Sequence, residues 1–465
     1  MSLAVREAER RALPGPAGIA AWAADALARL PAPTEPTALC AISVPAPTCT
    51  PERLLDLVPV GDAMLWAPPG EDAIAGVGVA FGVRAEGRDR FANVAREAEA
   101  LWPRLTVVRH PASAGPPPRL YGGLAFAPGA ADGAPWTGLG DADFALPRWR
   151  LAVGARGGAE LSLVVSNWDD PAVRQQIAGS IEAMLASLAG EPPAPSQPHA
   201  VSVDEQDPDL WRRQVDAIRR AIVHQRCDKI VAARSAMVTL AAPPSASAVL
   251  TRLGDRYPDC FRFAFRRGDA TFLGATPERL IARSGDRFDT VALAGTAPVG
   301  EADALLASAK DRVEQAHVVR AIREALAPLA SELTIPGEPL VRTLPGVLHL
   351  ETRIGGRLAR PAHVLELAAA LHPTPAVGGY PRAAALAWIA EHEPEPRGWY
   401  AAPVGWFDAA GDGELAVAIR SGVIRGDRAW LHAGAGIVRD SDPDAELAET
   451  RLKLRALAGV LGVEG

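Results

Sequence analysis

Residues 413–457 read GELAVAIRSGVIRGDRAWLHAGAGIVRDSDPDAELAETRLKLRAL and combine both kinds of regular structure. The first part predicts a pair of apolar strands joined by a Gly-Asp turn. The last part predicts a helix that begins at Asp442 and Pro443, because a capping side chain followed by proline favours a helix start. Strands joined by short turns, with helices inserted in blocks, are typical of an α+β fold with large antiparallel sheets.

The same pattern extends toward the N-terminus. Short apolar runs between Gly and Asp turns predict further strands at residues 229–240, 261–268, 270–276 and 287–295. Helix-like segments lie at residues 172–190, 210–225 and 301–330.

The strongest break in this pattern is rich in Pro, Ser and acidic residues. We therefore expect residues 1–190 to form the N-terminal half of the fold, residues 191–210 a linker-like segment, and residues 211–465 the region that holds the site.

Composition limits the classes of partner. The 465 residues are 48% hydrophobic and 22% charged, with a formal net charge of −7, which argues against nucleic acid or an anionic membrane as partner. Four scattered cysteines suit neither a disulfide framework nor a zinc site, so a reducing cytoplasm is expected. The N-terminus has no apolar core of a signal peptide, and no uncharged apolar stretch is long enough to span a membrane.

The final helix carries a charged stripe. At the helical period, Glu446, Glu449 and Lys453 fall on one side. They could form a solvated face with a Glu–Lys pair four residues apart, or they could face a cleft.

Three further motifs place charged residues beside strands or turns. In CDKIVAARS, Lys229 heads a strand and could act as a general base if it is partly desolvated, or it could mark a strand edge. In FLGATPERL, Glu278 could face a pocket or pair with its neighbour at the surface. In SAKDRVE, Asp311 and Glu314 lie one helical turn apart, as ligands of a divalent cation would, or belong to a mixed-charge surface.

Glycine-rich loops complete the set: ALAGTAPVG, LHPTPAVGGYPR, RGWYAAPVGWFD and HAGAGIV. Glycine allows backbone amides to approach an anion such as a carboxylate, although each loop could also be a plain turn. The phosphate-binding alternative is not supported, since no GxxxxGK[ST] occurs and the GxG at Gly434 and Gly436 lacks a third glycine.

Taken in order, these motifs resemble one family, the chorismate-utilising enzymes, which include anthranilate, aminodeoxychorismate, salicylate and isochorismate synthases. The resemblance covers about residues 212–458 and is loose before that, through YGGLAFAPG. The matching stretches are DKIVAARS, FLGATPERL, ALAGT, SAKDRVE, LHLETRIGG, LHPTPAVGGYPR, RGWYAAPVGWFD, AIRSGVI and AGAGIVRDSDPDAELAETRLK.

The resemblance implies a fold, a metal and a substrate. The fold would be a sandwich of large antiparallel sheets with helices on the outside, and residues 211–465 would be its chorismate-binding catalytic region. Glu314 and Glu449 would bind Mg²⁺ directly, with Asp311 and Glu446 acting directly or through water. The remaining residues implied to hold chorismate are Gly295, Thr296, His349, Tyr400, Arg420, Gly434, Gly436 and Lys453.

Two positions separate the members of the family. Lys229 replaces the glutamine of anthranilate synthases, so the ammonia route and a glutamine amidotransferase partner are not expected. Ala294 replaces the nucleophilic lysine of aminodeoxychorismate synthases. Among the remaining two reactions, the HPTPAVGG loop with His372, together with His349, favours an isochorismate synthase, and a salicylate synthase is the alternative.

The implied mechanism is the hydration of chorismate at C2 by water that Lys229 deprotonates. Glu278 would protonate the departing C4 hydroxyl. We expect a monomer that needs no redox cofactor. Two residues depart from the family pattern: Gln315 stands where a histidine often follows the metal-binding glutamate, and Ala402 replaces a glycine.

Overall fold

The structure is a computed structural model that describes residues 15–191, 197–344 and 347–463. Residues 1–14 and part of the expected linker, residues 192–196, lie outside the described residues.

The strands are β1 (Leu39–Ala46), β2 (Ala63–Ala67), β3 (Ala73–Ala85), β4 (Leu105–Arg109), β5 (Leu120–Leu124), β6 (Ala142–Val153), β7 (Ala159–Val165), β8 (Ala200–Glu205), β9 (Lys229–Leu240), β10 (Phe261–Arg267), β11 (Ala270–Thr276), β12 (Arg279–Ser284), β13 (Arg287–Pro298), β14 (Ala330–Thr334), β15 (Leu340–Leu344), β16 (Val347–Leu358), β17 (Gly379–Tyr380), β18 (Pro403–Phe407), β19 (Gly413–Val417), β20 (Ser421–Arg425) and β21 (Arg428–Ile437).

The helices are α2 (Pro16–Ala28), α3 (Glu52–Leu57), α4 (Arg90–Ala98), α5 (Pro171–Ala189), α6 (Pro208–Val223), α7 (Ala246–Arg256), α8 (Ala302–Ala307), α9 (Ala309–Leu326), α10 (Val364–Leu371), α11 (Arg382–His392) and α12 (Pro443–Ala458), with short 3-10 turns at Trp102–Arg104 and Gly459–Leu461.

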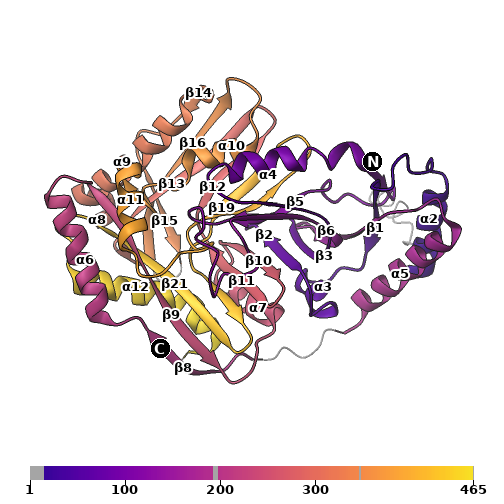
Figure 1. Ribbon diagram of the computed structural model, residues 1–465, viewed down its shortest axis with the longest axis horizontal. Coiled ribbons are helices and arrows are strands. Elements are labelled where there is room, and N and C mark those ends of the chain that lie inside the picture. The colour runs from indigo at the N-terminus through magenta and orange to yellow at the C-terminus, as the bar shows by residue number, and fades with distance from the viewer. Residues whose placement is uncertain (1–14, 192–196, 345–346, 464–465) are drawn as a thin grey trace, which may run out of the picture.

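The strands form two long antiparallel arms that meet at β6. One arm runs β6-β3-β2-β10-β11-β20-β21-β9, and the other runs β6-β5-β18-β19-β12-β13-β16. Among the described strands only β1 and β4 pair in parallel. The first arm joins β2 to β10 and the second joins β5 to β18, so both arms combine strands from the two halves of the chain (Figure 1).

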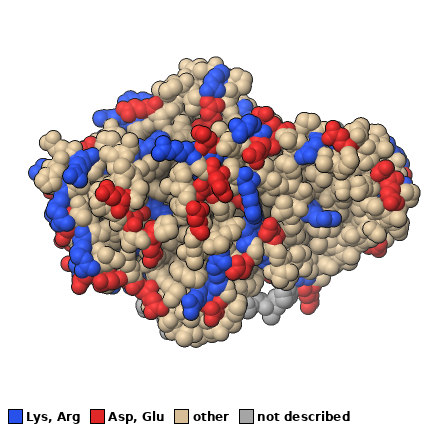
Figure 2. All heavy atoms as spheres, in the orientation of Figure 1, with Lys and Arg blue, Asp and Glu red and all other residues tan. Residues whose placement is uncertain are grey.

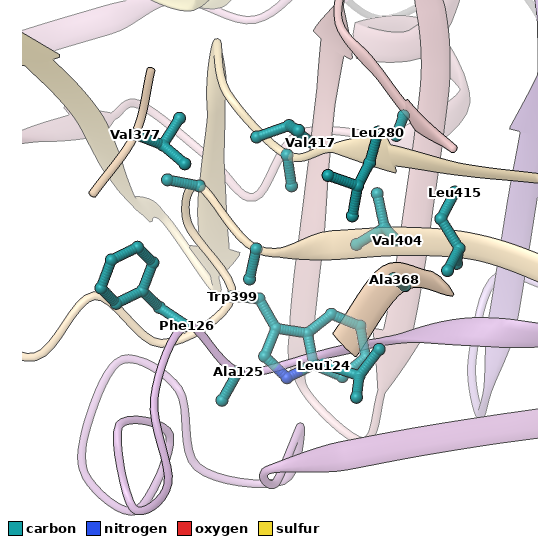
Figure 3. Packing of buried hydrophobic residues seen from close by; sticks show 14 of the residues in the cluster. Leu124, Ala125, Phe126, Leu280, Ala368, Val377, Trp399, Val404, Leu415 and Val417 are labelled. Atoms are coloured by element: carbon teal, nitrogen blue, oxygen red, sulfur yellow. The ribbon is translucent and has the colours of Figure 1, made fainter. Parts of the chain in front are cut away.

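The two arms enclose a common apolar core. Phe263 and Phe272 from the first arm lie in the same buried cluster as Leu280 and Leu415 from the second. Trp399 fills the space between them, beside Val404 and Leu124 (Figure 3). Helices cover the outer faces (Figure 1). The predicted α+β sandwich with external helices is therefore confirmed.

Residues 413–457 fold largely as predicted. β20 and β21 form the expected hairpin around Gly426, whose φ is 57°. α12 begins at Pro443, and the Asp442 carboxylate accepts hydrogen bonds from the Asp444 and Ala445 amides. The first predicted strand is interrupted, however, because β19 ends at Val417 and β20 begins at Ser421.

The predicted helix over residues 301–330 is wrong in its length and continuity. The structure divides it into α8 and α9 at Ser308, which is extended and accepts a hydrogen bond from the Asp311 amide. A serine in this position ends one helix and caps the next. α9 then stops at Leu326, and β14 begins at Ala330.

The expected linker contains a strand. β8 lies within residues 191–210 and pairs with the second half of β9. The division of the chain at this segment stays a prediction.

In the described part of the chain, no helix combines the length and apolar character needed to cross a membrane. Acidic and basic side chains are interspersed over the face shown in Figure 2, a distribution typical of a solvated surface.

Candidate active site

Two adjoining cavities gather all of the predicted site residues. The inner cavity, of about 140 Å³, is lined by every one of them except Asp311 and Glu446, which line an outer cavity of about 550 Å³. The residues common to both cavities are Lys229, Thr296, Glu314, Gly436 and Glu449. A larger open cleft of about 1310 Å³ over β12, β13 and β16 contains none of the predicted residues.

Lys229 enters the site from the first residue of β9. Its Nζ lies 2.7 Å from Oε1 of Glu314 on α9. The neighbouring strand β21 makes room for it with a glycine, because a Cβ on Gly436 would lie 2.6 Å from Cε of Lys229. The end of the lysine side chain therefore lies between a carboxylate and a glycine, and an added Cβ on that glycine would push the lysine aside.

Glu278 lies in the turn between β11 and β12. Its amide donates to Oγ1 of Thr276 at 3.2 Å, and its carbonyl accepts from the Val417 amide at 2.9 Å, so both sides of the turn are fixed. Burial raises the pKa of Glu278 to about 7, although the positive charges of Lys229 and Lys453 oppose the shift. Near neutral pH this carboxyl group is available as a proton donor.

The four predicted metal ligands come from the starts of two helices. Ser308 and Asp442 cap α9 and α12, which brings Asp311 and Glu314 into the same cavity as Glu446 and Glu449. Burial raises the pKa of Glu446, and the negative charge of Glu449 adds to that rise. Burial also opposes ionisation of Glu314, but the charge and hydrogen bond of Lys229 bring its pKa below the usual value.

The donor set suits Mg²⁺ in its chemistry, since four carboxylates offer hard oxygen ligands. Over the described ranges, no three His, Cys, Asp or Glu side chains stand close enough together to hold a metal ion. Glu314 is paired with Lys229, and Glu449 is paired with Lys453 at 2.6 Å. The carboxylates that would bind the cation are thus partnered with lysines in this arrangement.

A bulge in β13 shapes the wall opposite α9. The register with β16 shifts at Gly295, whose φ is 69° and whose missing side chain leaves room for Asp311. The Gly295 carbonyl accepts from Nδ1 of His349 at 2.9 Å, and Oγ1 of Thr296 lies 3.2 Å from the same nitrogen. Burial lowers the pKa of His349 to about 4, so the ring is neutral and its Nε2 is left as an acceptor.

Arg420 occupies the interruption between β19 and β20. Its φ of 51° is unusual for a residue with a long side chain. Burial lowers its pKa. Arg420 lines the inner cavity, where the in-plane N–H donors of its guanidinium could bind a carboxylate.

Tyr400 and Lys453 complete the inner wall. The ring of Tyr400 stacks on His432 at 5.4 Å, and burial raises the pKa of its hydroxyl. A Cβ on Gly434 would lie 3.1 Å from that hydroxyl. Nζ of Lys453 donates to the Gly434 carbonyl at 2.9 Å, so this strand also positions the lysine.

Two polar side chains that line the inner cavity are not among the residues predicted from the sequence. Arg397 and His432 are both buried there. Arg397 stands in the RGWYAAPVGWFD loop, which we singled out for its glycines alone. The one arginine in this otherwise largely apolar motif could have indicated a buried role for Arg397.

The chain matches the family model described as chorismate binding enzyme over residues 25–462. The chain belongs to this chorismate-binding enzyme family.

Named relatives lie within the same family. The chain is 37% identical over 361 residues to isochorismate synthase MenF of Bacillus subtilis, covering 75% of each chain. It is 38% identical over 420 residues to the salicylate biosynthesis isochorismate synthase of Pseudomonas aeruginosa, covering 86% of this chain and 85% of the relative. The structure resembles that of the menaquinone-specific isochorismate synthase MenF of Escherichia coli with a TM-score of 0.77, at 27% identity, over 95% of this chain and 99% of the other.

The structure explains one departure from the family pattern. Gln315 is buried, and its Nε2 donates to the Ala292 carbonyl at 3.0 Å and to Oγ1 of Thr352 at 2.9 Å. It ties α9 to β13 and β16 behind Glu314. Nothing in the structure explains the alanine at position 402.

Proposed function

We propose that this chain is an isochorismate synthase that isomerises chorismate to isochorismate reversibly with Mg²⁺. The observation that carries the proposal is the pair formed by Lys229 and Glu278 in one small cavity. Burial raises the pKa of Glu278 to about 7, so a proton donor and an amine share the site.

The two residues have opposite tasks. Lys229, in its uncharged form, takes a proton from water as the water oxygen bonds to C2 of chorismate. The ring double bonds shift, the bond between C4 and its hydroxyl breaks, and Glu278 supplies the proton with which that hydroxyl leaves as water. One water enters and one leaves, so the reaction is an isomerisation that needs no oxidant or reductant.

Glu314, Glu449, Asp311 and Glu446 are the residues proposed to hold the metal. When bound, Mg²⁺ supplies positive charge that neutralises and orients the ring carboxylate of the substrate. Glu314 and Glu449 would then exchange their lysine partners for the cation. Their placement at the starts of α9 and α12 supports this role.

Substrate carboxylates are assigned to Arg420 and Lys453. The planar guanidinium of Arg420 suits bidentate binding of the pyruvyl carboxylate. Neutral His349 and the hydroxyls of Tyr400 and Thr296 offer further hydrogen bonds, and the glycines at 295, 434 and 436 give the backbone close approach.

We also propose that the enzyme acts as a single chain without an amidotransferase partner, in a reducing compartment such as the cytoplasm. Lys229, in place of the glutamine of the ammonia-using members, supports the first point. The second is supported by the four cysteines, all of which are free in the structure.

Chromatography of one reaction tests the proposal. Purified chain with chorismate and Mg²⁺ is expected to accumulate isochorismate, and the same chain supplied with isochorismate is expected to form chorismate, until both reactions reach one ratio. Dominant formation of salicylate and pyruvate would instead favour the alternative reaction, and anthranilate in the presence of ammonia would exclude the role assigned to Lys229.

A further inference from the structure

The strand that carries Lys229 has an incomplete edge. β9 pairs with β21 along one side. On its other side, β17 covers Lys229 and Ile230, and β8 begins to cover it only at Ala236. On this second side, the main chain from Val231 to Ser235 has no partner strand among the described residues. The Val231 amide still donates to the Gly378 carbonyl at 3.0 Å, and the Ser235 carbonyl accepts from the Gln206 amide at 3.4 Å. The Val231 carbonyl and the Ala233 amide are among the main-chain groups left for other partners.

A buried ion pair occupies that interval. The Arg397 and Glu393 side chains are 3% and 6% exposed, and the Arg397 guanidinium donates through Nε to Oε2 of Glu393 at 2.7 Å. Nη2 of Arg397 donates to the Val231 carbonyl at 2.7 Å, and Oε1 of Glu393 accepts from the Ala233 amide at 3.0 Å. One donor and one acceptor are thus offered to alternate residues of β9, as a neighbouring strand would do.

Arg397 also joins two other walls of the inner cavity, one through its guanidinium and one through its main chain. Its Nη1 donates to the Val377 carbonyl at 2.7 Å, which lies in the HPTPAVGG loop. The carbonyl of Arg397 accepts from the Tyr400 amide at 2.9 Å, and its guanidinium lies 4.3 Å from the ring centroid of Phe126. Val231, Val377 and Tyr400 all line the inner cavity.

We infer that Arg397 and Glu393 act as a positioning pair, which completes the edge of β9 and thereby holds Lys229 in register with the substrate-binding walls. The inference rests on the proposed function for its kinetic consequence. An ion pair at this place requires both partners, because either charge left alone would be buried without compensation. Lysine cannot replace Arg397, since a single ammonium does not reach Val231, Val377 and Glu393 in a planar fork.

The test compares Arg397→Lys and Glu393→Gln with a surface control, Glu366→Gln, whose glutamate pairs with exposed Arg360. At a temperature where circular dichroism shows all proteins folded, kcat is expected to fall about 10- to 100-fold in the two site variants, because displacement of a reacting group by about 1 Å has that effect. KM for chorismate is expected to stay within about threefold, since the assigned carboxylate contacts remain. The control is expected to match the wild type.

A double variant separates positioning from stability. Arg397→Met alone would leave the buried Glu393 charge without a partner and is expected to lower the melting temperature. Adding Glu393→Gln removes that charge and is expected to raise the melting temperature again. If the pair positions Lys229, the double variant regains stability without regaining kcat. Recovery of kcat together with stability would overturn the inference, as would site variants with normal kcat or a loss explained wholly by KM.

Hydrogen exchange measures the same contacts without turnover. Amides of residues 229–235 are expected to exchange faster in Arg397→Met than in the wild type and to be unchanged in Glu366→Gln. Unchanged exchange in Arg397→Met would contradict the edge-completing role even if the wild type were inactive on chorismate. Absence of wild-type turnover, by contrast, would overturn the proposed function and leave this result to decide the role of the pair.

Discussion

Replacing Glu278 by glutamine separates the catalytic role of its proton from the cost of burying its charge. With a pKa of about 7, the carboxyl is protonated in about half of the molecules at pH 7, whereas at the usual value of 4.5 the fraction would be about one in 300. Glutamine has no proton to donate to the leaving hydroxyl. We expect Glu278→Gln to lose about 10²- to 10⁴-fold in kcat, measured by chromatography of chorismate and isochorismate.

The stability of the same variant relative to the wild type should increase as pH rises from 4.5 to 8. Because the pKa of Glu278 is raised on folding, the folded protein binds more protons than the unfolded chain between pH 4.5 and about 7, and stability falls as pH rises through this range. Relative to Glu278→Gln, the wild type should lose up to about 3 kcal/mol of unfolding free energy between pH 4.5 and pH 8. Wild-type turnover should likewise decline above pH 7.

Denaturant unfolding at both pH values, with Glu366→Gln as control, measures this difference. A variant that keeps more than about a tenth of wild-type kcat would show that another group is the acid. A stability difference between the two proteins that does not change with pH would show that the pKa of Glu278 is not raised on folding.

Three further predictions concern the other side chains of the site. Gly436→Ala should lower kcat at least tenfold while the protein stays folded, because the new Cβ would lie 2.6 Å from Cε of Lys229 and push that side chain aside. Normal activity of this variant would show that the glycine is not needed to position Lys229. Glu314→Gln should abolish Mg²⁺-dependent turnover and weaken Mg²⁺ binding measured by calorimetry. Full activity of this variant in the presence of a chelator would contradict the assignment of the metal ligands. Lys229→Gln should lose turnover yet still bind chorismate, as titration would show, because Arg420 and Lys453 remain; unchanged kcat would require a different base.

Features that depend on neighbouring residues in the sequence could be predicted from the sequence. Asp442 and Pro443 marked the start of α12 because capping is a local interaction. Lys229 headed its strand as expected, and the hairpin turn at Gly426 followed from the dipeptide. The ordered series of motifs was enough to predict the family.

Features that depend on contacts between distant parts of the chain could not be predicted from the sequence. Arg397 and Val231 are 166 residues apart, and no local pattern indicates that one completes the strand edge of the other. The sequence predicts one continuous strand through Arg420, but the left-handed φ of this residue interrupts it. Local strand propensity does not indicate an interruption at a site residue. The contact between Asp311 and Gly295 likewise joins α9 to the bulge in β13, and no local pattern indicates it.

The central claim is that water, activated by Lys229, becomes the new hydroxyl at C2. It can be tested directly by running the reaction from unlabelled chorismate in water enriched in ¹⁸O and analysing the early product by mass spectrometry. We predict that isochorismate formed in the first turnovers carries one ¹⁸O atom in its C2 hydroxyl. Unlabelled isochorismate would show that the original hydroxyl migrates within the substrate, and it would contradict the roles assigned to Lys229 and Glu278.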